Sequence, residues 1–339
     1  MEPRLNSRNL KFRNKINKKK WIMISLIILV LLAATGYLFR KELSVLVFNT
    51  LLKDDVKTIL DKSYKPVGYE KNKPQAFEGE PFSLLLLGVD QRDKEPSRSD
   101  TVIYSVIRPK DNKVLLVSIP RDSYTDIIGR DVQSKINSAY AHGGAKMAID
   151  TVEHLLNHKV DYYGAINFHG VIDIVDAVGG VELPITEVIE NKNPNHEPLR
   201  IEPNKPVYDG QDALSYVRYR EDSDFKRTER QRIFIKALMG KFLELKNITK
   251  VPELMEIAGS NFTTNMDPDF ILDLAEAVLL NDTPPDFENY MLQGKGTMRG
   301  TVWYYDLDAA DLEYTQDLIS NWLNNGTDPG ELIHPKEMN

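Results

Sequence analysis

A chain of 339 residues with no cysteine and a net charge of −7 cannot form disulfide bonds or cysteine-ligated metal sites. The charge is uneven: residues 1–20 hold eight Lys/Arg and one acid and contribute +7, so the rest of the chain carries −14. This acidic body argues against nonspecific binding of nucleic acid. It is also long enough to bury a core as one large domain or two small ones.

An uncharged apolar run occupies residues 21–39 (WIMISLIILVLLAATGYLF). As a helix it would be about 28 Å long, close to the roughly 30 Å hydrocarbon core of a bilayer. The excess of Lys/Arg in residues 1–20 places this basic tail in the cytoplasm. A cleaved signal peptide, the alternative, has a shorter apolar core and a small-x-small site, which residues 35–39 lack. The sequence therefore predicts a single-pass protein of the cell membrane, with everything after Arg40 outside the cytoplasm.

Residues 40–80 are predicted to form an extracellular stalk, because helical spacing at 44–63 gives way to a polar segment with two prolines. An outer domain follows at 81–339. Strands are predicted at 82–90, 101–108, 113–121 and 162–168; helices at 137–157, 170–178, 228–245, 268–280 and 309–324; and a polar loop at 187–206. This alternation predicts an α/β domain with a central sheet covered by helices on both faces.

Two acids flank the first predicted connection between strands. Asp90 ends the first strand in GVDQR, and Asp100 opens the second in SRSDT. The connection is short, so both carboxylates can lie at one edge of the sheet, where they would suit a hard cation such as Mg²⁺. Acids are also common at strand ends, so the spacing alone leaves both interpretations open.

Basic residues follow the third strand and precede the first long helix. Arg121 lies in VSIPRD, and the carboxyl ends of strands are where open α/β sheets bind ligands. Lys135 precedes Asn137, and a helix N-terminus with an adjacent lysine is a potential anion site. The alternatives are a weak surface ion pair between Arg121 and Asp122, and an ordinary helix start.

A cluster of basic residues occupies 218–232, RYREDSDFKRTERQR, in an otherwise acidic domain. Arg218 and Arg220 would share one face of an extended segment. Arg227 lies three residues before Arg230 and four before Gln231, so these side chains would share one face of the following helix. Guanidinium groups match pairs of phosphate oxygens. Alone, the stretch is more typical of a solvated charge run, because four acids nearly balance it. Together with the strand-end clusters it indicates a site for pyrophosphate and a metal ion.

The N-terminal anchor and motifs of the chain resemble those of the LytR–CpsA–Psr family. The motifs are GVDQR, SRSDT, VSIPRDSY, SKINSAYAHGG, DIVDAVGGVEL, LSYVRYR and DFKRTERQR, in that order, and the core of the resemblance runs over residues 82–235. The resemblance implies a domain at 81–339 that is an α/β/α sandwich with a central mixed sheet, preceded by one transmembrane helix. It also implies a hydrophobic tunnel for a polyprenyl chain. One departure is Ser223, where the family often has glycine.

The resemblance further implies a phosphotransferase. Such an enzyme moves an anionic glycopolymer, for example wall teichoic acid or capsular polysaccharide, from a polyprenyl-pyrophosphate carrier to a peptidoglycan hydroxyl. Asp90 and Asp100 would hold Mg²⁺, with Mn²⁺ as the alternative ion, and Asp90, Asp100 and Arg121 would be catalytic. The implied pyrophosphate ligands are Arg98, Arg121, Lys135, Arg218, Arg220, Arg227, Arg230 and Gln231, with Arg92 and Asp224 in support. The resemblance does not indicate which of Arg227 and Arg230 contacts the phosphates.

Three other functions are compatible with these motifs. The protein could be a polyprenyl-pyrophosphate phosphatase, a non-catalytic protein that binds lipid-linked polymer, or a transcriptional attenuator of the cell envelope. The predicted topology opposes the last, because only about 20 residues would face the cytoplasm. The first differs from a transferase in its acceptor, which is water rather than a sugar hydroxyl.

Overall fold

The computed structural model describes residues 53–67, 77–90, 97–193, 198–242, 256, 261–281 and 283–336. Its strands are β1 (Phe82–Asp90), β2 (Arg98–Arg108), β3 (Lys113–Ser118), β4 (Tyr124–Ile127), β5 (Val132–Lys135), β6 (Tyr162–Asn167), β7 (Ile189–Glu190), β8 (Arg200–Ile201), β9 (Phe262–Thr264), β10 (Asp286–Met291), β11 (Gly294–Arg299) and β12 (Val302–Leu307). Its helices are α3 (Lys53–Ser63), α4 (Ser138–Leu156), α5 (Phe168–Ala177), α6 (Gly210–Arg218), α7 (Asp224–Phe242), α9 (Pro268–Leu280) and α10 (Ala309–Leu323).

Six of the described strands form one mixed sheet in the order β10-β3-β2-β1-β6-β9. β2 is antiparallel to β1 and β3, whereas β6 is parallel to β1 and β10 is parallel to β3. The predicted mixed α/β fold with a central mixed sheet is thereby confirmed. The carboxyl ends of β1, β3, β6 and β10 meet at one edge of the sheet, beside the start of β2.

The alternation of side chains along β1 divides the core between the two faces of the sheet. Leu85, Leu87 and Val89 are buried in a cluster with α4 and α10 on one face. Phe82 and Leu84 point to the opposite face and pack against α9. Burial of one such aliphatic side chain contributes about 1.5–3 kcal/mol to stability. A shift of β1 by one residue would turn these side chains to the other face, so the alternation determines the register of the central strand.

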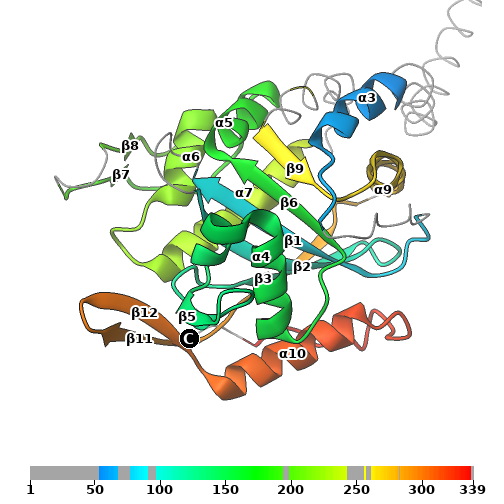
Figure 1. Ribbon diagram of the computed structural model, residues 1–339. Helices are drawn as coiled ribbons and strands as arrows, with labels where there is room; N and C mark the ends of the chain where they lie inside the picture. The colour runs from blue at the N-terminus through cyan, green and yellow to red at the C-terminus, as the bar shows by residue number, and fades with distance from the viewer. Residues whose placement is uncertain are drawn as a thin grey trace, which may run out of the picture.

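Helices α5, α6 and α7 form a second apolar cluster beside the sheet (Figure 1). Val175 of α5, Ala213 and Tyr216 of α6 and Phe234 of α7 are buried in it. α5 contacts β1 and β6, and α7 contacts β10. These contacts bring the start of α5 and the polar residues of α6 and α7 to the sheet edge where the parallel strands end.

Residues 53–67 fall within the predicted stalk, and the structure places them against the domain. Leu60 of α3 is buried, and the Lys65 N–H donates to the carbonyl of Thr264 in β9 over 2.7 Å. The Tyr163 hydroxyl donates to the Lys65 carbonyl over 3.0 Å. The predicted transmembrane segment at 21–39 and the basic tail at 1–20 lie outside the described residues. Within the described ranges, no helix is long and apolar enough to span a membrane.

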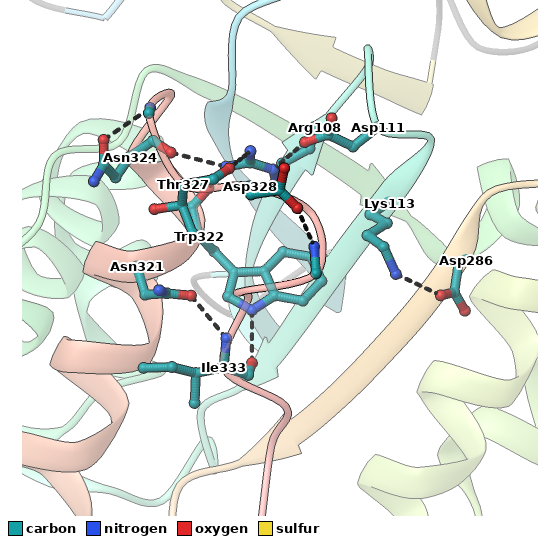
Figure 2. Close-up of polar contacts among 12 residues, drawn as sticks. Arg108, Asp111, Lys113, Asp286, Asn321, Trp322, Asn324, Thr327, Asp328 and Ile333 are labelled. Atoms are coloured by element: carbon teal, nitrogen blue, oxygen red, sulfur yellow. Dashed lines mark hydrogen bonds and ion pairs between the residues drawn. The ribbon is translucent and has the colours of Figure 1, made fainter.

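The C-terminal segment completes the sheet and covers one of its faces. β10 is an edge strand, and Trp322 of α10 is buried in the main core. The buried Arg108 of β2 donates to the carbonyls of Trp322, Asn324 and Thr327 over 2.7, 3.0 and 2.8 Å, as Figure 2 shows. The end of α10 leaves carbonyl groups without helical partners, and this guanidinium satisfies them while tying the helix to the sheet.

The sequence did not predict several short elements. They are the β4–β5 hairpin, α6, β9, β10 and the β11–β12 hairpin, and the predicted polar loop at 187–206 contains β7 and β8. The long predicted helix exists as α4 but is kinked at Gly143 and Gly144, which have non-helical backbone angles. Predicted and observed strands otherwise differ by a few residues at their ends.

Candidate functional site

A pocket of about 370 Å³ lies at the sheet edge where β2 begins and β3 and β6 end. Its walls come from β2, the residues after β3, the start of α5, the ends of the β7–β8 hairpin, α6 and α7. Four arginines line it: Arg121, Arg218, Arg220 and Arg227. Asp100 is the one carboxylate among its described lining residues. The pocket is therefore strongly cationic, as a site for a multiply charged anion requires.

A β-bulge brings Asp100 into the pocket. In the pairing of β1 with β2, Gly88 lies opposite Thr101 and Val89 opposite Ser99, so Asp100 is the extra residue. Asp100 and Thr101 both line the pocket, although adjacent residues of a regular strand point to opposite faces. Any Cβ at Gly88 would come within 2.9 Å of the Thr101 Cβ, so glycine permits this close approach of the strands.

Arg121 sits between two carboxylates. Its Nη1 donates to Asp100 Oδ1 over 2.8 Å, and its Nε lies 3.6 Å from Asp122 Oδ2. The Lys135 Nζ lies 2.8 Å from Asp122 Oδ1, so Asp122 connects two predicted site residues. Lys135 is not among the residues that line the pocket; it contacts Asp122, which in turn contacts Arg121. The predicted ion pair between Arg121 and Asp122 exists, and the Asp122 side chain in it is mostly buried.

Helix α6 supplies one wall of the pocket. Gln211, Ser215 and Arg218 are spaced four and three residues apart, so they lie on one face of the helix, and all three line the pocket. The predicted extended segment at 218–220 is wrong at Arg218, which is the last residue of α6; Arg220 follows the helix. The guanidinium of Arg218 lies 4.6 Å from the centre of the Phe168 ring, a cation–π contact that fixes its place at the start of α5.

The two candidate arginines of α7 differ in position. Arg227 and Gln231 both line the pocket, as their predicted i, i+4 spacing requires. Arg230 does not line it: its guanidinium donates to both carboxylate oxygens of Asp222 over 2.7 and 2.9 Å and to the Tyr219 carbonyl over 2.6 Å. Burial alone would raise the pKa of Asp222, but the hydrogen bonds from Arg230 and the Ser223 N–H lower it below its usual value.

The remaining predicted site residues lie around this edge. Asp90 ends β1, on the same strand face as Leu84, and is paired in register with Arg98, which is exposed at the start of β2. Asp224 is the first residue of α7. Arg92 lies outside the described residues. Within the part of the chain that the structure describes, no three His, Cys, Asp or Glu side chains gather as a metal site.

Sequence reasoning missed several pocket residues. They include Thr101, Phe168, Asn191, Leu199, Gln211 and Ser215. A usable signal existed for two of them, because the Asp209 side chain caps α6 by accepting from the Asp212 N–H. Had that cap been recognised, a helix starting at Gly210 would have placed Gln211 and Ser215 on the face of Arg218. No local pattern marks the β7–β8 residues.

The LytR_cpsA_psr family model matches residues 51–320 of the chain. The sequence is 31% identical over 311 residues to the polyisoprenyl-teichoic acid–peptidoglycan teichoic acid transferase TagU of Bacillus subtilis, covering 89% of this chain and 96% of that protein. It is 35% identical over 297 residues to TagU of Enterococcus faecalis, covering 85% and 95% of the two chains.

Solved structures resemble the fold. The crystal structure of B. subtilis TagV superposes with a TM-score of 0.64 at 27% identity and covers 73% of this chain and 98% of its own. TagT bound to LI-WTA superposes with a TM-score of 0.61 at 26% identity and covers 77% and 99%.

Proposed function

Because the chain belongs to the LytR_cpsA_psr family, we propose that it transfers an anionic glycopolymer from a polyprenyl-pyrophosphate carrier to a hydroxyl of peptidoglycan. The polymer is a wall teichoic acid or a capsular-type polysaccharide, and similarity to TagU favours the former. The observation that carries this proposal is the pocket with four arginines and one aspartate at the carboxyl edge of the sheet.

The proposed reaction breaks a phosphoanhydride bond and forms a phosphoester bond. The acceptor hydroxyl oxygen attacks the phosphorus that carries the glycopolymer, and the bond from this phosphorus to the bridging oxygen breaks. Polyprenyl phosphate leaves, and the hydroxyl proton passes to a base, for which Asp90 is our candidate. The arginines would bind the pyrophosphate oxygens in pairs and stabilise the charge that develops on the leaving phosphate.

The surroundings of each arginine suit this role. Arg121 is oriented by Asp100 and Asp122, and Arg218 by the Phe168 ring, so neither needs large reorganisation to meet a phosphate. Arg227 and Gln231 share one face of α7 and would bind adjacent oxygens. Arg230 would instead hold the turn that precedes α7 through Asp222.

We further propose that Asp90 and Asp100 hold Mg²⁺, or alternatively Mn²⁺. Two carboxylates at one sheet edge fit such an ion, because Mg²⁺ in phosphate-binding sites commonly takes one or two carboxylates and completes its shell with waters and substrate phosphates. When bound, the ion would neutralise charge on the pyrophosphate. Arg121 already bonds Asp100 and would remain within reach of both carboxylate and phosphate.

The lipid carrier implies a site close to a membrane, which fits the predicted anchor at 21–39 and a catalytic domain outside the cytoplasm. Since residues 53–67 pack on the domain, we propose that the spacer between the anchor and the domain is residues 40–52 rather than all of 40–80. A short spacer would keep the pocket near the outer leaflet.

The test is transfer of polymer from a lipid-linked donor to peptidoglycan by the full-length protein in detergent. Removing one pocket arginine, in Arg121→Ala, Arg218→Ala or Arg227→Ala, is expected to lower the rate at least tenfold. Arg130→Ala is the matched control, since Arg130 is exposed in the β4–β5 turn and does not line the pocket. Unchanged rates in all three pocket variants would refute the site assignment. Release of polyprenyl phosphate without acceptor would indicate a phosphatase.

A further inference from the structure

The β11–β12 hairpin is not needed to close the core. β10 and α10, which flank it in the chain, complete the sheet and cover its face, whereas the hairpin forms its own two-stranded sheet (Figure 1). One face of the hairpin packs on the β4 region, and exposed apolar side chains on the other face add a cost. Yet Met298 and Trp303 are 57% and 40% exposed. The exposure of these apolar side chains is therefore not explained by the stability of the fold.

One face of the hairpin carries two neighbouring aromatic rings, of which Trp303 is exposed and Tyr305 partly exposed. Residues directly opposite in the pairing share a face, and these include the pairs Met298–Trp303 and Gly296–Tyr305. The Trp303 indole lies over Gly296, where any Cβ would come within 2.8 Å of the ring. The Trp303 and Tyr305 rings are 6.3 Å apart and inclined by 37°. We call Gly296, Met298, Trp303 and Tyr305 the hairpin platform.

The hairpin platform is connected to the arginine pocket through Asp122. The Tyr305 N–H donates to the Asp122 carbonyl over 2.9 Å, and Tyr305 forms a bridge with Ser123. The side chain of Asp122 contacts Arg121, which lines the pocket. On the other hairpin face, Tyr304 packs on Tyr124 at 5.0 Å. A ligand on the platform would therefore lie a few residues from the reacting phosphate.

The platform also lies away from the side on which the preceding chain enters. Figure 1 shows α3, the first described helix, at the opposite end of the molecule from the β11–β12 hairpin. An anchor preceding α3 would place the membrane on the α3 side. The hairpin would then face away from that membrane.

We propose that the hairpin platform binds the glycan strand of the acceptor. The ring faces of a pyranose present C–H groups, which pack on the electron-rich faces of aromatic rings, and two neighbouring aromatic rings can contact successive sugars of an extended chain. The inference rests on the proposed transferase function, because that reaction requires a polysaccharide acceptor beside the phosphate site. It assigns the hairpin a role in acceptor binding and none in donor binding.

The binding experiment uses the full-length protein in detergent and a β-1,4-linked hexamer of N-acetylglucosamine as the probe, measured by titration calorimetry. Trp303→Ala is expected to weaken binding at least tenfold, whereas Trp303→Phe keeps a ring over Gly296 and stays within about threefold. Val302→Ala is the matched control, because Val302 is 42% exposed on the opposite face of the hairpin and should change nothing. Equal unfolding temperatures show that the domain remains folded, and an unchanged transfer rate at saturating peptidoglycan shows that the Asp122–Arg121 segment beside the hairpin keeps its structure.

Kinetics separate this inference from the proposed function. In the transfer assay Trp303→Ala should raise KM for peptidoglycan while KM for the lipid-linked donor stays constant. Failure of the wild type to bind the hexamer, or equal affinity in Trp303→Ala, overturns the inference. Binding to phosphatidylglycerol vesicles that depends on Trp303, without hexamer binding, also overturns it. Hexamer binding with no transfer in any variant would sink the transferase function and leave the platform standing.

Discussion

Arg230 and Arg227 offer a sharp test, because the two side chains are three residues apart on α7 and the structure gives them different tasks. Arg230 makes three hydrogen bonds, two to Asp222 and one to the Tyr219 carbonyl, and its side chain is only 10% exposed. Charge-assisted hydrogen bonds contribute about 1.5–3 kcal/mol each when buried, and the 25% exposure of the Asp222 side chain reduces this. We therefore expect Arg230→Ala to lower the free energy of unfolding by about 3 kcal/mol.

That loss corresponds to a fall in unfolding temperature of about 6–12 °C for a domain of this size. In a double-mutant cycle, Arg230→Ala and Asp222→Ala should couple by about 1–2 kcal/mol. Arg227→Lys keeps the charge in the pocket but loses the forked guanidinium, so it should cut transfer about tenfold and move the unfolding temperature by less than about 2 °C. Differential scanning calorimetry and the transfer assay measure the two effects. Two outcomes would refute these different roles of Arg230 and Arg227. One is that the effects of Arg230→Ala and Asp222→Ala on stability are additive. The other is that Arg230→Ala keeps its stability but loses more transfer activity than Arg227→Lys.

The same pair predicts a dependence of stability on pH. The pKa of Asp222 is lower in the folded protein than its usual value, so the folded state favours the ionised carboxylate. The stabilisation is fully present above the unfolded pKa of about 4 and is lost as the pH falls through the folded pKa. Asp222→Asn should therefore be less stable than wild type at pH 7, and the difference should shrink below about pH 4, as measured by urea unfolding. A difference that stays constant down to pH 2 would contradict the ion pair.

Three further predictions concern the fold and the pocket. Gly88→Ala should destabilise the protein by about 1–3 kcal/mol and reduce transfer, because the new Cβ displaces Thr101. Gly240→Ala is the control: its Cβ meets open space in α7, so it should be neutral or stabilise the protein by up to about 1 kcal/mol. Equal urea unfolding midpoints for the two variants would contradict this. Arg108→Met should cost about 3–5 kcal/mol, because the carbonyls at the end of α10 and Asp111 lose their partner; an unchanged midpoint would contradict that role. Inorganic pyrophosphate at 100 times its Kd should stabilise the wild type by about 2.7 kcal/mol, seen as a higher unfolding temperature that Arg218→Ala lacks.

The sequence by itself determined the parts of this protein that depend on local pattern. Continuous apolar runs predicted β1 and β3 because strands covered on both faces have no polar side, and helical spacing predicted α4, α9 and α10. The pairing of Arg227 with Gln231 on one face followed from helix geometry alone. The ordered motifs also sufficed to recognise the family, because several chemical clusters occurred at compatible spacing.

Tertiary structure decided everything that depends on a partner far away in the chain. Arg227 and Arg230 are equivalent as sequence, and only the position of Asp222 turns one of them away from the pocket. The bulge that brings Asp100 to Arg121 is a property of strand register, which no single strand encodes. β11 (GKGTMR) is polar and Gly-rich and gives no strand signal, whereas the β-branched and aromatic residues of β12 (VWYYDL) are typical of a strand and were overlooked. The hairpin is stabilised by contacts with the β4 region. Local sequence pattern therefore determines which helices and strands form, but long-range packing determines which charged side chains contact one another.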